Sequence, residues 1–101
     1  MKHYNGLLPA EAERLALLRE ECGEVQHAIG KILRHGWEST HPDGGPTNRE
    51  ALQCEIGHVY AAVELMTLCA QDLDFTAIGR SCGDKVEKVK KYLHYDVLQG
   101  R

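Results

Sequence analysis

Apolar residues recur in alternating steps of three and four along two long stretches of this chain, and this spacing limits its fold more than any other feature. The first stretch contains Leu15, Leu18, Cys22, Val25, Ile29 and Ile32. The second contains Leu52, Ile56, Val59, Val63 and Met66. Such spacing places apolar side chains on one face of an α-helix, and no stretch shows the alternation of a β-strand. The sequence therefore predicts an all-α fold, an antiparallel helix bundle.

Residues that commonly start and stop helices flank these stretches. Pro9 suits a first helical turn, where its missing N–H costs nothing. Gly36 suits the C-terminal end of that helix. Thr47, with Glu50 three residues later, forms a capping box that predicts the start of a second helix running to about Ala70.

A third helix is predicted after a cap at Asp72 or Asp74. Its apolar face is marked by Ile78, Cys82, Val86, Val89 and Leu93. The loop over residues 37–46 is dense in turn-forming residues, and it is either functional or a simple connection. At this length, residues 1–101 are expected to form a single domain.

Composition excludes several classes of protein. A net charge of −3 argues against stable nucleic-acid binding. The longest apolar stretch, residues 59–70, is interrupted by Glu64 and Thr67, so no membrane association is expected. With no visible signal peptide, a cytoplasmic location is expected, in the host cytoplasm if the protein is phage-encoded. The four cysteines form no C-x-x-C pair and are expected to be reduced core residues.

Two acidic segments of the predicted helices lie at matching angles. With about 100° per residue, Glu21 lies roughly 50° and Glu24 roughly 110° from the centre of their apolar face. Glu55 and His58 lie roughly 60° and 120° from theirs in the same sense. Antiparallel packing would therefore bring these four side chains to one edge of the helix pair. Glu20 points nearly outward.

Converging carboxylates repel one another unless positive charge lies among them, so the four residues predict a divalent metal site. Oxygen ligands favour Mg²⁺ or Mn²⁺. The alternative is a solvated acidic face. Gly23 and Gly57 lie between the paired residues, and each costs about 1 kcal/mol relative to alanine. This cost predicts that a neighbour or a ligand comes close there.

The pattern Glu20-Glu21-x-x-Glu24, followed by Glu55-x-x-His58, resembles the metal-binding signature of the MazG-like all-α nucleoside triphosphate pyrophosphohydrolases. That signature is E-E-x-x-E followed by E-x-x-D. Residues 29–36 also resemble small phage-encoded members. The resemblance covers about residues 9–94.

The resemblance implies a bundle of antiparallel helices that assembles as a dimer or a dimer of dimers, with sites near the subunit interfaces. It implies hydrolysis of a (d)NTP to (d)NMP and pyrophosphate, dependent on Mg²⁺ or Mn²⁺. Glu21, Glu24 and Glu55 would be metal ligands, joined by His58. Glu20 and Glu21 would be the catalytic residues, with Glu20 orienting the attacking water.

Several residues are candidates for binding the substrate, namely Lys31, Trp37, Asn48, Lys85 and Lys88. The two last lysines match basic residues of a later helix that reach the phosphates in the family. Trp37 would either stack on a base or cap the bundle, and His41, Asp43 and Asn48 could read base edges. The MazZ-type branch of phage enzymes acts on (d)GTP, which makes a purine such as (d)GTP the expected substrate.

His58 departs from the family pattern, which has Asp at this position. Imidazole binds Mn²⁺, Co²⁺ or Zn²⁺ better than Mg²⁺. His58 therefore predicts an altered metal preference, a different role such as a structural histidine, or a catalytically impaired helical dimer that binds nucleotide or a partner. A purely structural helical assembly factor is a third reading.

Overall fold

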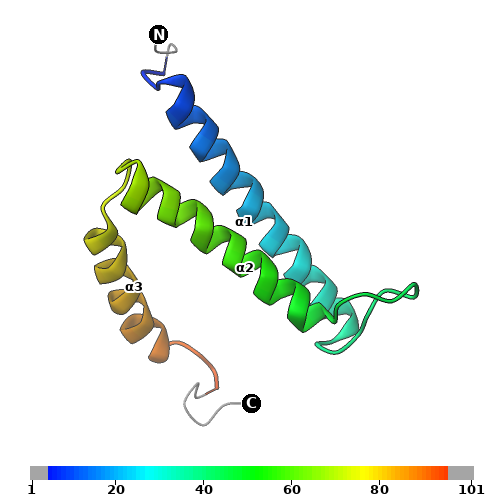
Figure 1. The fold of residues 1–101 in the computed structure, drawn as a ribbon. Coiled ribbons are helices and arrows are strands. Elements are labelled where there is room, and N and C mark those ends of the chain that lie inside the picture. The colour runs from blue at the N-terminus through cyan, green and yellow to red at the C-terminus, as the bar shows by residue number, and fades with distance from the viewer. Residues whose placement is uncertain (1–4, 96–101) are drawn as a thin grey trace.

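A computed structural model describes residues 5–95, which form helices and no strand. The elements are α1 (Pro9–His35), α2 (Asn48–Glu64), the π-helical turn η1 (Leu65–Cys69) and α3 (Phe75–Lys90). In Figure 1, α1 and α2 run antiparallel and side by side, and α3 turns back along α2 from its far end. The all-α prediction is confirmed.

The ends of the helices follow the predicted signals closely. Pro9 opens α1, and Gly36 ends it with a φ of 89°, a conformation that favours glycine. The Thr47 side chain accepts a hydrogen bond from the backbone N–H of Glu50, and the Glu50 carboxylate accepts one from the N–H of Thr47. Of the two candidate caps of α3, Asp74 is the one used, and it accepts from the N–H of Thr76.

The second helix continues past α2 through η1, which brings it to the predicted end near Ala70. The N–H of Ala70 donates to the carbonyl of Leu65, five residues back. The hydroxyl of Thr67 donates to the carbonyl of Val63, which keeps a polar group of this wider turn paired. Met66 is almost fully buried here, so the turn belongs to the core.

The contact between α1 and α2 extends from the predicted apolar faces toward the acidic residues, because Glu21 and Glu55 are partly buried, as Leu18 and Val59 are. Ala28 and Ala62 are buried in it, and their small side chains allow the two helices to approach closely. In contrast, Leu15, Ile29 and Ile56 are about 40% exposed (42%, 41% and 38%), so they lie at the border of the interface and not at its centre, where they were predicted. Part of the predicted apolar face is therefore left uncovered.

An ion pair fastens α1 to the segment beyond η1. The Arg14 guanidinium donates from Nε and Nη2 to the two oxygens of Asp72, at 2.6 and 2.9 Å. Both side chains are partly buried, and two parallel bonds of this kind fix the geometry of the pair. Asp72, predicted as an alternative helix cap, thus connects the two ends of the helical hairpin instead.

This ion pair predicts a pH dependence of stability. Arg14 lowers the pKa of Asp72 below its ordinary value of about 3.9. A lowered folded-state pKa stabilises the fold above the unfolded-state value, and the contribution is lost as pH falls through the folded-state value. The raised pKa of Arg14 matters only at strongly alkaline pH.

We therefore expect Asp72→Asn to lower the free energy of unfolding at neutral pH and to reduce its fall between about pH 5 and pH 2. Urea denaturation across this range measures both effects. Asp43→Asn is a matched control, since the side chain of Asp43 is 93% exposed. An unchanged acid dependence in Asp72→Asn would contradict the assignment.

The described part of the chain is extended for its size. Its radius of gyration is 17.2 Å, whereas a compact domain of 100 residues has about 13 Å. Along α3 every residue except Val89 is exposed, although the helix has a clear apolar face. Within residues 5–95, no helix combines the length and apolar character needed to cross a bilayer.

Candidate metal site between α1 and α2

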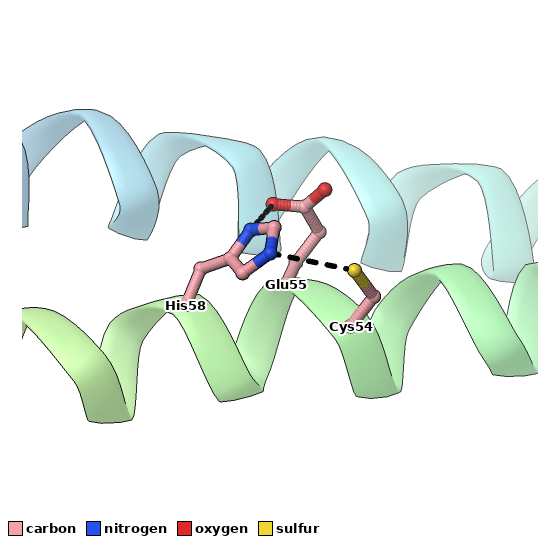
Figure 2. A group of neighbouring side chains, drawn as sticks. All are labelled: Cys54, Glu55 and His58. Carbon is pink, nitrogen blue, oxygen red and sulfur yellow. Dashed lines mark hydrogen bonds and ion pairs between the residues drawn. The ribbon is translucent and has the colours of Figure 1, made fainter.

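The imidazole of His58 lies between carboxylates from both helices. Its Nδ1 is 3.5 Å from Oε2 of Glu21 on α1 and 3.4 Å from Oε2 of Glu55 on α2. Figure 2 shows the ring of His58 reaching toward Glu55 on one side and Cys54 on the other. The two carboxylates are mostly buried, with 18% and 24% of each side chain exposed, whereas His58 is about half exposed. Three of the four predicted ligands are therefore neighbours.

The fourth predicted ligand, Glu24, lies one turn along α1 from this cluster. It lines a small cavity of about 120 Å³ together with Glu55, His27, Lys31 and Asn48. Glu55 is thus common to the His58 cluster and to this cavity. The four residues form a line along the edge of the helix pair, with Glu55 at its centre.

Cys54 joins the cluster, which sequence reasoning missed. Its Sγ is 3.5 Å from Nε2 of His58, one helical turn away on α2. The four cysteines are all exposed free thiols, so their predicted place in the core is wrong. The i, i+4 spacing of Cys54 and His58 was the available signal, because residues four apart share a helix face.

The possible donor atoms lie at two different nitrogens of the His58 ring, with Glu21 and Glu55 at Nδ1 and Cys54 at Nε2. One ligand atom each from Cys54, Glu55 and His58 lies within 4.8 Å of the others, and Glu21 reaches the same imidazole. Two carboxylates with an imidazole suit Mn²⁺ better than Mg²⁺, and inclusion of the thiolate favours Zn²⁺.

The remaining acidic and basic candidates lie elsewhere. Glu20 is exposed, about 100° around α1 from Glu21, so a single chain does not bring it to the His58 cluster. Lys85 and Lys88 are on α3, which has no extensive packing against α1. These lysines would meet the cluster only through another copy of the chain or a different position of α3.

The candidates near the loop have structural partners. Asn48 donates from its amide nitrogen to the carbonyl of Gly36 at 3.0 Å and, more weakly, to that of Lys31, so it caps the end of α1. The guanidinium of Arg49 lies over the ring of Trp37, 4.6 Å from its centroid. One face of Trp37 is therefore already covered, while the side chain is still half exposed.

The two glycines of the acidic segments, Gly23 and Gly57, have no close neighbour in the chain. A Cβ atom added at Gly23 or Gly57 would meet nothing within 4 Å. The prediction of a close approach is therefore wrong for contacts within one chain. A close approach at these glycines could still come from a ligand or from a second copy of the chain.

Comparison of the chain with protein-family models, with curated proteins and with solved structures found no match. The function is therefore inferred from the arrangement of the chain's own residues and from its acidic motif.

Proposed function

We propose that this protein is a metal-dependent nucleoside triphosphate pyrophosphohydrolase, converting a (d)NTP and water to a (d)NMP and pyrophosphate. The observation that carries the proposal is the convergence of Glu21, Glu55 and His58 from two antiparallel helices. Glu24 extends the same acidic edge. This arrangement is what the E-E-x-x-E and E-x-x-D pattern implies, with histidine in the last position.

The chain's own residues would perform separate tasks in this reaction. Glu21, Glu55 and His58 would hold a divalent ion, with Glu24 as a further ligand. Such an ion neutralises phosphate charge and lowers the pKa of a bound water. Lys31, at the edge of the cavity that contains Glu24, is placed to attract a phosphate oxygen. The motif assigns Glu20 to water orientation, which its exposed position allows only if another surface covers that side of α1.

A second candidate is a nucleotide-binding or partner-binding protein without catalytic activity. The favouring observation is that His58 Nδ1 lies at 3.5 and 3.4 Å from two carboxylates. A protonated imidazole there would supply the positive charge that a metal otherwise supplies. Binding of nucleotide without turnover would identify this case.

The test is incubation with each of the eight common NTPs and dNTPs, in Mg²⁺ and separately in Mn²⁺, with product identification. We expect monophosphate and pyrophosphate, higher rates in Mn²⁺, and a preference for a purine such as (d)GTP. Excess chelator should abolish turnover. Diphosphate with phosphate as products would contradict the assigned bond cleavage, and absence of turnover with both metals would favour the second candidate.

We further propose that the protein acts as a homodimer or a dimer of dimers. A hollow of about 390 Å³ lies between α2, η1 and α3, lined chiefly by apolar side chains such as Val59, Val63 and Ile78. At its rim, Tyr60, Leu68 and Phe75 are 60–72% exposed. A second copy offers a complementary apolar face, because each chain leaves the same face of α3 uncovered.

Phe75→Glu is expected to weaken self-association at least about tenfold, because a charge would enter the apolar contact. Sedimentation velocity over a range of protein concentrations measures this. Leu33→Glu is the matched control, since Leu33 is 82% exposed on α1 and outside the hollow. A wild-type protein that sediments as a monomer at every concentration would overturn the proposed assembly.

A further inference from the structure

A basic cleft lies at the end of the helix pair where α1 meets the 37–46 loop. It has a volume of about 400 Å³ and is open to solvent on one side. Apolar atoms make up most of its lining, and its polar groups come from Lys31, Arg34, His35, Ser39, Thr40, His41 and Asn48. Among the described residues that line it, none carries a carboxylate. Two fixed cations and two imidazoles around one hollow are the surroundings that favour an anion.

The acidic groups near the cleft do not cancel its preference for an anion. Glu38, in the same loop, is held by Arg49 at 2.8 Å. Asp43 lies 3.6 Å from His41, and both are exposed to solvent that screens them. The cleft is next to the C-terminus of α1, where the helix dipole contributes about half a negative charge. The two cations outweigh this, and Asn48 already covers the carbonyl of Gly36.

The cleft is continuous with the acidic site. Lys31 and Asn48 line both the cleft and the small cavity that contains Glu24 and Glu55. One edge of the molecule therefore passes from carboxylates to cations within about three helical turns of α1, from Glu24 to Arg34. A ligand that fits this order of charges along the edge has a metal-binding phosphate next to further phosphates.

We propose that the basic cleft binds the β- and γ-phosphates of the substrate and retains the pyrophosphate product. This inference rests on the proposed function for its orientation. Water would form a bond to the α-phosphorus beside Glu24 and Glu55, and the bond from that phosphorus to the bridging oxygen would break. The bridging oxygen would leave within pyrophosphate, into the cleft, and the proton lost by the water would pass to solvent.

Arg34 provides the sharpest test, because it is a fixed cation outside the proposed metal ligands. Isothermal titration calorimetry with inorganic pyrophosphate in the presence of chelator measures the cleft without any turnover. We expect wild-type protein to bind with a dissociation constant below about 1 mM, and Arg34→Gln to weaken binding at least about tenfold. Arg19→Gln, an exposed arginine of α1 outside the cleft, should change it less than about twofold.

A second readout separates this inference from the proposed function. If the protein hydrolyses NTP, Arg34→Gln should raise the inhibition constant of pyrophosphate while leaving inhibition by NMP unchanged. Pyrophosphate binding that depends on Arg34 in a protein without turnover would support the cleft and refute the enzyme. Equal losses of pyrophosphate binding in Arg34→Gln and Arg19→Gln would refute the proposed role of the cleft, even if hydrolysis is found. Absence of pyrophosphate binding by the wild-type protein would refute it as well.

Discussion

Glu55→Gln is expected to lower kcat/KM for NTP hydrolysis by at least about a hundredfold in either metal. Glu55 faces His58 at 3.4 Å and also lines the cavity that contains Glu24, so it is the one carboxylate common to both parts of the site. Glutamine keeps the shape of the side chain and removes the charge that would hold a cation. No other single change in the cluster affects both parts at once.

The effect on stability distinguishes a metal ligand from a structural residue. In chelator, Glu55→Gln should unfold at nearly the same temperature as wild type, because the change removes both the repulsion between Glu21 and Glu55 and the contact of Glu55 with His58. Addition of Mn²⁺ should raise the melting temperature of the wild-type protein and not of the variant, since only a folded state that binds the ion gains stability.

Glu13→Gln is the matched control for this experiment. It removes a carboxylate from an exposed position of α1 that lies outside the cluster. Its activity and its melting temperature in Mn²⁺ should equal those of the wild type. Full activity in Glu55→Gln, with Mn²⁺ still raising its melting temperature, would contradict the proposed site.

The helices were predictable because their ends carry local signals. Pro9, Gly36 and the Thr47–Glu50 capping box act over three or four residues and need no knowledge of the fold. The face of each helix that packs against the other was less predictable, because the prediction assumed that large aliphatic residues mark the interface. The structure instead buries Ala28 and Ala62, because small residues permit close packing.

The candidate site was predictable as far as it depends on the pairing of α1 and α2. Equal angular offsets brought Glu21, Glu55 and His58 together even though the contact between the helices extends beyond the predicted apolar faces. The angular offsets of the site residues still match, because the contact extends toward the acidic edge on both helices. The place of Lys85 and Lys88 could not be predicted, because the packing of α3 depends on what covers its apolar face rather than on its own periodicity.

His58→Asp is expected to shift the metal preference, raising activity in Mg²⁺ relative to Mn²⁺ by about tenfold or more. Aspartate would replace the imidazole by the oxygen ligand that Mg²⁺ prefers and restore the E-x-x-D pattern. It would also place a third carboxylate beside Glu21 and Glu55, where the imidazole of His58 now lies. The measurement is kcat/KM with one preferred nucleotide across a range of each metal.

His58→Asn is the matched control, because it removes the imidazole without adding a carboxylate. If His58 is a metal ligand, Asn should lower activity in Mn²⁺ and fail to gain activity in Mg²⁺. If His58 instead neutralises the carboxylates of an inactive protein, the wild type should show no turnover, and only His58→Asp should gain it. Equal losses with both metals in both variants would assign His58 a structural role, and the metal would then be held by the glutamates alone.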